Sequence, residues 1–339
     1  MNLPIFIVLL SLAILLFGCG GMKEVDISKK EEKNGIVYVE NQKKPFTGKI
    51  ISKYENGQIK MESQYKDGKL EGTVKEYYED GQVHNEWNYK DNHLDGEQRK
   101  YYENGQLSTE KYYKDNKVEG IFKEYYEDGK IKSETEYKKG KKDGIYKLYI
   151  ENGNLKYETN FKNGKIEGIF KEYHENGNIS VEANIKNEKK DGIYKKYYEN
   201  GNLNIETNME ENKIKGAYKV YYENGQLYSE TKYKDGKQEG IYRQYYNNGQ
   251  LNIETSYNDG KKDGSYKSYY VTGEIADESH YKNGKLEGSH KEYYKNGQLI
   301  FEKNYKNGKT EGTVTFYTSS GKEEKKVKYK NDEIIKVIK

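Results

Sequence analysis

The stretch Gly216-Ala-Tyr-Lys-Val-Tyr-Tyr-Glu-Asn-Gly225-Gln-Leu-Tyr-Ser-Glu-Thr-Lys-Tyr233-Lys-Asp-Gly236-Lys-Gln-Glu-Gly240 decides the fold, because its first and last glycines begin successive copies of one unit. The same glycine returns every 24 residues along most of the chain, at Gly48, Gly72, Gly96, Gly120, Gly144, Gly168, Gly192, Gly216, Gly240, Gly264, Gly288 and Gly312. A fixed period of this length is typical of repeat proteins, in which each unit packs mainly on its neighbours. Function is therefore expected to come from a repeated surface rather than from one unique pocket.

A second glycine follows each of these at a constant distance. Counting the first glycine as position 0 of the repeat, the second stands at position 9, usually after Asn or Asp at position 8. Asn-Gly or Asp-Gly between Tyr-, Val- and Ile-rich runs predicts a β-hairpin with a two-residue type I′ turn. The predicted turn glycines are Gly57, Gly81, Gly105, Gly129, Gly153, Gly177, Gly201, Gly225, Gly249, Gly273 and Gly297. Stretches such as Lys66-Asp67-Gly68-Lys69 supply a second turn, which joins one hairpin to the next.

This turn predicts which residues face each other across the hairpin. Because its central residues stand at positions 8 and 9, the repeat positions of any two facing residues add up to seventeen. Position 3 is Lys or Arg in ten of the twelve repeats and position 14 is Glu in eleven. These positions add up to seventeen, so each base is expected to face an acid, a contact worth about 0.2–1 kcal/mol. The ladder explains why 59 basic and 56 acidic residues nearly cancel to a net charge of +3. We therefore expect no nucleic-acid partner.

The same register sorts the other side chains between two faces. Positions 2, 6, 11 and 17, which are mostly aromatic or aliphatic, are predicted to share one face. The aromatic residue at position 17 would face the glycine at position 0 and cover its bare backbone. Position 5, almost always Tyr, is predicted on the opposite face beside the Lys–Glu ladder.

The fold class follows from these patterns. With 33% hydrophobic and 34% charged residues the composition alone resembles that of a disordered chain, but the 38 tyrosines recur at fixed positions of the repeat. We expect an all-β protein, an elongated single-layer antiparallel sheet of about twelve 24-residue β-hairpin repeats. A sheet of this length should twist or curl.

The two ends of the chain differ from the repeats. An apolar run that ends in Leu16-Phe17-Gly18-Cys19 resembles a bacterial lipoprotein signal, which would make 1–18 a signal peptide and Cys19 the lipidated residue. The remaining boundaries are expected at 19–35 for a polar tether, 36–47 for an N-terminal cap strand and turn, 48–325 for the repeat array and 326–339 for a C-terminal cap strand. The expected location is the bacterial cell envelope, as a membrane-anchored lipoprotein. Secretion is the alternative.

The repeat pattern, nearly complete in Gly216–Gly240 and Gly288–Gly312, resembles the MORN repeat variant. That repeat occurs in bacterial proteins of the YwqK type, which are described as antitoxin components of toxin–antitoxin pairs. The resemblance covers about residues 36–335. It implies a binding protein without catalytic activity whose partner is a protein, and a toxin is the partner that the antitoxin description suggests. A signal and a lipid on Cys19 would place that role at the envelope, as immunity or scaffolding.

No catalytic or metal-binding motif stands out. The five histidines, His84, His93, His174, His280 and His290, occupy five different positions of the repeat. The repeated Asp-Gly and Glu-Gly pairs fit turn chemistry better than calcium binding, because lysines stand beside them. We therefore expect no enzyme, no metal and no cofactor.

The tyrosines at position 5 are the candidate partner-binding residues, because a row of rings can bind another molecule. They are Tyr77, Tyr101, Tyr125, Tyr149, Tyr173, Tyr197, Tyr221, Tyr245, Tyr269 and Tyr293. The opposing interpretation is that these rings brace one another along the sheet. A cell-wall or glycan-binding adhesin and a passive spacer remain as alternatives to a protein-binding role.

Overall fold

The computed structural model describes residues 22–338. The predicted signal peptide 1–18 and the predicted lipidation site Cys19 lie outside this range. The chain divides into two compact units, Met1–Lys117 and Val118–Lys339, which are called here the N-terminal and the C-terminal unit. Within 22–338 no helix is both long enough and apolar enough to cross a membrane.

The N-terminal unit is built almost entirely from strands. Strands β4 to β9 follow one another as antiparallel neighbours in chain order. The elements are β1 (Glu24–Asp26), the short 3-10 helix η1 (Ile27–Lys29), β2 (Lys30–Lys33), β3 (Ile36–Val39), β4 (Gly48–Lys53), β5 (Ile59–Lys66), β6 (Lys69–Tyr77), β7 (Val83–Lys90), β8 (His93–Tyr101) and β9 (Leu107–Lys114).

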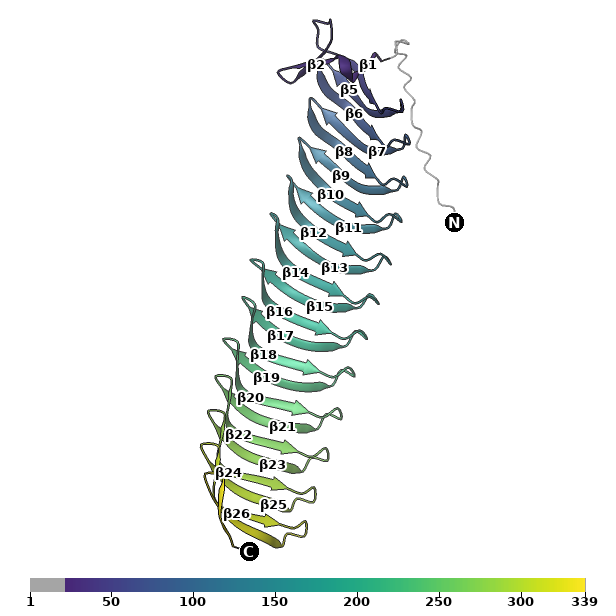
Figure 1. Ribbon diagram of the computed structural model, residues 1–339. Helices are drawn as coiled ribbons and strands as arrows, with labels where there is room; N and C mark the ends of the chain where they lie inside the picture. Colours follow the sequence, from purple (N-terminus) through teal and green to yellow (C-terminus); the bar gives the residue numbers. More distant parts are fainter. Residues whose placement is uncertain (1–21, 339) are drawn as a thin grey trace, which may run out of the picture. The chain divides into compact units, whose positions relative to one another are not determined.

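The C-terminal unit repeats the same antiparallel arrangement, and its strands lie side by side in chain order in one layer (Figure 1). Its strands are β10 (Lys117–Tyr125), β11 (Ile131–Lys138), β12 (Lys141–Tyr149), β13 (Leu155–Lys162), β14 (Lys165–Tyr173), β15 (Ile179–Lys186), β16 (Lys189–Tyr197), β17 (Leu203–Glu210), β18 (Lys213–Tyr221), β19 (Leu227–Lys234), β20 (Lys237–Tyr245), β21 (Leu251–Asn258), β22 (Lys261–Tyr269), β23 (Ile275–Lys282), β24 (Lys285–Tyr293), β25 (Leu299–Lys306), β26 (Lys309–Tyr317), β27 (Glu323–Lys330) and β28 (Glu333–Val337). The prediction of antiparallel hairpin repeats is confirmed.

The predicted register is confirmed over most of each hairpin. In the repeat that begins at Gly216, the glycine faces Tyr233 and Lys219 faces Glu230, as positions that add up to seventeen must. The same pairs recur in the neighbouring repeats, for example Gly240 with Tyr257.

The turn at position 9 differs from the predicted type I′ turn. Gly225 donates its N–H to the carbonyl of Tyr222 at 2.9 Å, so the central residues of the turn are Glu223 and Asn224. Tyr222 also donates to the carbonyl of Gln226 at 2.8 Å, which closes a three-residue loop with a glycine bulge. Of the Asn-Gly pair only Gly225 takes a positive φ, +86°. All eleven predicted turn glycines share this conformation, with φ between +80° and +102°.

The longer loop moves one set of side chains to the other face. Beyond it Tyr221 faces Leu227, at positions 5 and 11, and a bulge restores the predicted register at Val220 and Ser229. Directly opposite residues in an antiparallel pair point to the same side of the sheet. The prediction that position 11 lies on the aromatic face is therefore wrong, and it shares the face of the position 5 tyrosine.

The second turn of each repeat carries the type I′ chemistry instead. Asp235 and Gly236 both take positive φ, +52° and +79°, between the facing residues Lys234 and Lys237. An acid precedes most of the position 0 glycines and serves the next turn, as Glu239 does when its carboxylate accepts the N–H of Asp259 at 3.1 Å. The repeated Glu-Gly and Asp-Gly pairs are thus explained by turn formation.

The position 0 glycine has a second role besides facing an aromatic ring. All twelve of these glycines take positive φ, between +78° and +150°. Each internal one lies where the register with the preceding strand shifts, as Gly168 does between the pairs Phe161–Ile166 and Thr159–Phe170. A side chain there would strain the backbone, which explains why glycine recurs at this position.

The N-terminal unit begins with folded strands in a region where we predicted an unstructured tether. Residues 24–33 form β1, η1 and β2; β1 pairs in parallel with β4, and β2 forms a separate two-stranded sheet with β3. The tether prediction for 19–35 is therefore wrong from Glu24 onward. Its cause is a small apolar core that polar flanking residues obscured, formed by Val25, Val37, Val39, Phe46, Ile50 and Tyr65. The strand predicted at the start of 36–47 is present as β3.

The last strands of the C-terminal unit are less buried. Instead of one cap strand over 326–339, β27 begins at Glu323 and belongs to the last full hairpin, and β28 follows it. Every residue of β28 is exposed. This strand extends the sheet without covering its final side chains.

Candidate binding surface

A continuous row of alternating charges crosses the strands of the C-terminal unit. Glu158 faces Lys147 on one side and Lys171 on the other, and the same alternation runs on through the following strands. Some pairs are close, for example Arg243 and Glu254 at 2.8 Å between Nε and Oε2. We call the side of the sheet that carries this row, with positions 1, 3, 5, 14 and 16 of each repeat, the ladder face. Its charges largely satisfy one another.

The position 5 tyrosines lie on the ladder face, as predicted. All ten candidate tyrosines are half-buried. Tyr173 donates its hydroxyl to Glu158 of the preceding repeat at 3.0 Å, and Tyr293 donates to Glu278 in the same way at 2.7 Å. In the N-terminal unit Tyr77 makes the same contact with Glu62 at 2.7 Å. These hydroxyls thus connect consecutive repeats.

Burial and the neighbouring carboxylate keep these hydroxyls protonated. Burial first, and then the hydrogen bond to Glu134, raise the pKa of Tyr149 to about 12. The same two causes, with Glu158 as the acceptor, raise the pKa of Tyr173 to about 12. At neutral pH each phenol is therefore a hydrogen-bond donor, which fits the bracing interpretation of this row.

Position 6 forms a second row of links between repeats. Tyr222 donates its hydroxyl to the backbone carbonyl of Tyr245 at 2.9 Å, and Tyr246 does so to that of Tyr269 at 2.8 Å. Each hydroxyl spans from one hairpin end to the next. These bonds hold the hairpin ends at a regular spacing.

Exposed isoleucines form a row that sequence reasoning missed. They stand at position 1, and their side chains remain about half exposed: Ile121 56%, Ile145 50%, Ile169 46%, Ile193 49% and Ile241 48%. Position 1 lies two residues from the ladder base, so both point to the same side of the strand. We call these five residues the isoleucine row. Its signal in the sequence is an aliphatic residue that recurs at a position expected to face solvent.

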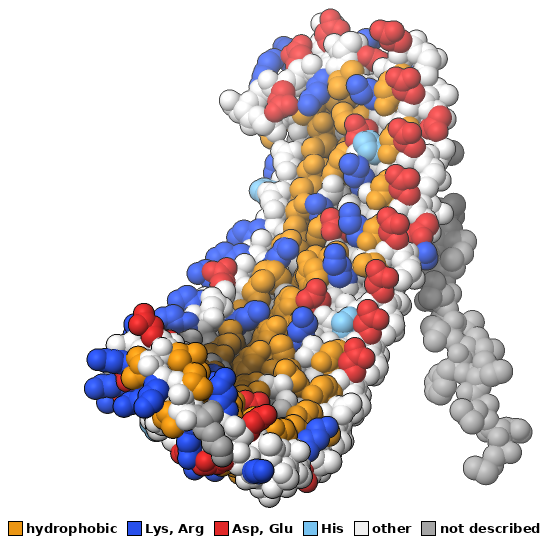
Figure 2. All heavy atoms as spheres, turned by 60° about the horizontal axis from the view of Figure 1, so that its bottom comes forward, with side chains coloured by type: hydrophobic (Ala, Val, Ile, Leu, Met, Phe, Trp, Pro, Cys, Tyr) orange, Lys and Arg blue, Asp and Glu red, His pale blue; other side chains and the backbone are white. Residues whose placement is uncertain are grey.

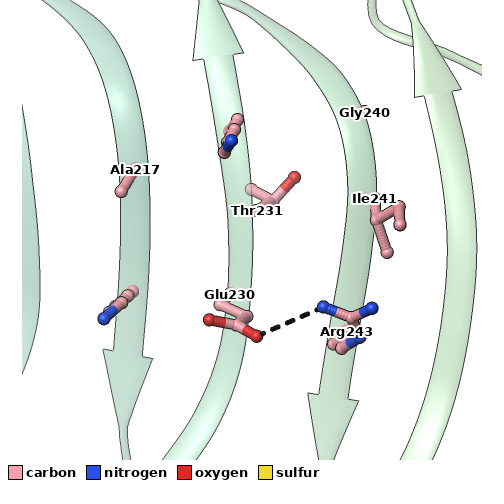
Figure 3. Close-up of a pocket in the computed structure, with 8 residues that line it drawn as sticks. Ala217, Glu230, Thr231, Gly240, Ile241 and Arg243 are labelled. Carbon is pink, nitrogen blue, oxygen red and sulfur yellow. Dashed lines mark ion pairs between the residues drawn. The ribbon is translucent and has the colours of Figure 1, made fainter.

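The isoleucine row is interrupted at Ala217, where a hollow opens (Figure 3). This hollow measures about 400 Å³ and is lined by Ala217, Lys219, Glu230, Thr231, Lys232, Gly240, Ile241 and Arg243. An ion pair of 3.7 Å between Arg243 and Glu230 lies along its border. The small alanine side chain leaves unfilled the space that an isoleucine occupies in neighbouring repeats.

The opposite side of the sheet carries aromatic pairs. Tyr218 packs edge-to-face on Tyr233 with 5.6 Å between ring centroids, and Tyr266 packs on Tyr281 at 6.0 Å. Lys262 lies over both rings of the second pair, at 4.5 and 5.0 Å. Hydrophobic side chains gather in stripes on the face shown in Figure 2, with charged side chains beside them.

The histidines do not converge. His290 contacts Asp277 at 2.5 Å, whereas His84 lies against the ring of Tyr78 in the N-terminal unit. Among residues 22–338 no group of three or more His, Cys, Asp or Glu side chains is placed to hold a metal ion.

Comparisons with solved structures give remote similarities. One is a crystal structure of TcdB2-TccC3-TEV, with 10% identity, a TM-score of 0.17, and coverage of 85% of this chain and 15% of that chain. Another is a Tc holotoxin pore of Photorhabdus luminescens, with 11% identity, a TM-score of 0.18, and coverage of 83% of this chain and 17% of that chain. No curated protein matches the sequence.

The family comparison is more informative. The model described as the MORN repeat variant matches eleven successive segments, which together make up more than half of the chain and follow the phase of the hairpins. The matched residues are 46–67, 70–91, 94–115, 118–139, 142–163, 166–187, 190–211, 215–235, 238–259, 262–283 and 286–307. The chain therefore belongs to the MORN repeat variant family.

Proposed function

We propose that this protein is a non-catalytic binding protein of the bacterial cell envelope, which holds a protein partner against the ladder face of its C-terminal unit. Its narrower role, by the resemblance to YwqK-type proteins, is that of an immunity component that neutralises a toxin. Both the protein nature of the partner and the location at the cell envelope are proposed here.

The observation that carries the proposal is the isoleucine row. Folded proteins rarely leave contiguous apolar surface open to water unless it serves an interaction. Here five isoleucines stand at equivalent positions, each about half exposed. Two strands per repeat at about 4.8 Å each place Ile121, Ile145, Ile169 and Ile193 roughly 10 Å apart, whereas Ile241 follows Ile193 after about 20 Å because Ala217 stands between them. Full burial of an exposed aliphatic side chain is worth about 1.5–3 kcal/mol, so covering the exposed half of each isoleucine is worth roughly 0.8–1.5 kcal/mol, and several together could support a stable complex.

The chemistry beside the row favours a protein partner. Bases and acids alternate there and pair with each other, as Lys195 and Glu206 do at 3.6 Å. A polyanion would meet as many acids as bases on this face. A protein surface that offers apolar side chains between charges of both signs fits the row better.

The envelope location rests on the Cys19 signal. We expect the wild-type chain in the membrane fraction of its native cells and the Cys19→Ser variant in the soluble or secreted fraction. A lipid-modified N-terminal peptide, found by mass spectrometry in the wild type alone, supplies the matching chemical evidence. Equal distribution of both variants would argue against the anchor.

The partner is tested by crosslinking and affinity capture from native cells, followed by mass spectrometry. We expect one stoichiometric protein. The double variant Ile169→Asp, Ile193→Asp should bind it at least about 30-fold more weakly, because two apolar contacts are lost and two charges are buried, and loss of a hot-spot contact costs about 2 kcal/mol or more. Val271→Asp is the matched control, since Val271 is equally exposed, at 48%, but lies in a turn.

Two outcomes would contradict the proposal. Equal loss of affinity in the control would show that added negative charge, and not the isoleucine row, weakens the complex. Capture of wall glycan alone, with binding that survives protease treatment of the wall material, would favour the adhesin alternative.

A further inference from the structure

The hollow at Ala217, called here the Ala217 hollow, is larger than the space left where position 1 keeps isoleucine. It measures about 400 Å³, whereas the hollow between Ile145 and Ile169 measures about 150 Å³. Another hollow, where position 1 is serine, lies beside Ser265 and Ser289 and measures about 560 Å³. A small residue at position 1 thus opens space on the ladder face.

The Ala217 hollow also differs from the other two in charge. Its charged lining residues are one acid, Glu230, and three bases, Lys219, Lys232 and Arg243. The smaller hollow is lined by one base and one acid, and the larger one by two lysines and two glutamates beside a histidine. Of the three, the Ala217 hollow alone carries a clear surplus of bases.

The surplus base is a departure from the repeat. In the three preceding repeats the residue that faces the position 1 isoleucine is asparagine, as Asn208 faces Ile193. In this repeat Lys232 faces Ala217. The same pair of facing positions has therefore lost apolar bulk and gained a cation.

The acid of the Ala217 hollow is already engaged. Glu230 pairs with Arg243 at 3.7 Å and accepts the hydroxyl of Tyr245 at 3.1 Å. Arg243 is engaged as well, because its Nε lies 2.8 Å from Oε2 of Glu254. These contacts leave the two lysines as the groups that can bind a ligand.

Neither lysine forms an ion pair within residues 22–338. Lys219 faces Glu206 on one side and Glu230 on the other, without an ion pair to either. Lys232 faces Glu239 in the next strand, again without an ion pair. A carboxylate from outside the chain could approach both ammonium groups and form charge-assisted hydrogen bonds, which are among the stronger ones in proteins.

The walls of the hollow suit a side chain with an apolar stem and an acidic end. Ala217 and Ile241 lie on the two strands that flank the strand of Glu230 (Figure 3). We propose that the Ala217 hollow is an anchor site for an aspartate or glutamate side chain of the protein partner. The anchor site rests on the proposed function, since Ile193 and Ile241, each roughly 10 Å from Ala217, would hold apolar partner residues on either side.

The probe that tests the anchor site is a library of random peptides displayed on phage and selected on the purified full chain. We expect enriched peptides to combine an acidic residue with aliphatic ones. A synthetic copy should bind Ala217→Ile at least about tenfold more weakly, because isoleucine closes the hollow. Ser265→Ile is the matched control, since it fills the other large hollow and should leave binding unchanged.

The ionic contact is tested with Lys232→Asn, which installs the residue that the preceding repeats carry. This change, or replacement of the peptide's acid by its amide, should weaken binding by about threefold to fivefold. Together they should weaken it by less than the product of their separate effects, because both remove the same contact.

Several outcomes would overturn the anchor site. These are no enriched peptide, peptides without an acid, equal binding to Ala217→Ile and wild type, or fully independent effects of Lys232→Asn and the amide. If such peptides still bind Ile169→Asp, Ile193→Asp more weakly, the ladder face remains a binding surface and only the anchor site fails. Capture of the partner from native cells tests the proposed function separately. Unchanged thermal unfolding of each variant shows that folding is not the cause.

Discussion

The Phe46→Ala substitution is expected to lower the free energy of unfolding of the N-terminal unit by about 3–5 kcal/mol. Phe46 is 1% exposed and lies in the core that also contains Val25 and Val37. Its ring centroid stands 6.4 Å from that of Tyr65, and its backbone N–H donates to the carbonyl of Val37 at 2.8 Å. Alanine would leave a cavity in the apolar core that joins Val25 of β1 and Val37 of β3 to the first hairpin.

The measurement is amide hydrogen exchange along the chain, because repeat proteins lose stability locally rather than all at once. Protection should fall in β1, β3, β4 and β5 and stay unchanged in the C-terminal unit. Phe46→Leu is the control, since a similar volume should cost less than about 1.5 kcal/mol. If leucine and alanine destabilise equally, or if protection is lost evenly along the chain, cavity formation is not the cause.

The Gly48→Ala substitution should cost the same unit about 3 kcal/mol, from backbone strain and overpacking together. Gly48 takes a φ of +150°. A Cβ atom there would lie 2.4 Å from the carbonyl oxygen of Lys23 and 2.7 Å from Cζ of Phe46. That carbonyl accepts the N–H of Lys49 at 2.7 Å, so the methyl group would push β1 away from β4.

The matched control is Gly216→Ala, at the same position of another repeat. Gly216 has a φ of +80°, and nothing lies within 4 Å of a Cβ added there. Only the cost of a left-handed backbone applies, about 1–2 kcal/mol. Thermal unfolding, with hydrogen exchange of β1 and β4 as the local probe, compares the two variants. A loss at Gly216 as large as that at Gly48 would mean that backbone strain alone acts and that the clash with Lys23 is relieved.

The hairpins and the charge ladder could be predicted because each copy of the repeat provides a separate test of the same strand pairing. Lys219 and Glu230 alone would be one pair among many, but the same residue types recur at the same two positions in nearly every copy. An alternating row of this kind is compatible with one register, and Lys219 does face Glu230. The position 5 tyrosines followed correctly from the same register.

The turn at position 9 was predicted less well because a three-residue loop and a type I′ turn both contain Asn or Asp followed by Gly. Asn224-Gly225 and Asp235-Gly236 look alike in sequence, yet only the second pair has positive φ at both residues. The length of the first loop depends on how the strands on either side of it pair. That pairing error moved Leu227 to the wrong face.

Local periodicity thus determined from the sequence alone that this chain is a series of antiparallel hairpins, that its charges pair across strands, and that glycine must recur at two positions. The tertiary structure decided which side chains are buried, because burial depends on the strands that lie beside each residue. It showed which apolar residues stay uncovered, as Ile193 and Ile335 do, and which polar-looking segment folds back, as Glu24–Lys33 does. Burial is a property of the surroundings of a side chain, and these surroundings depend on which strands and side chains lie beside it.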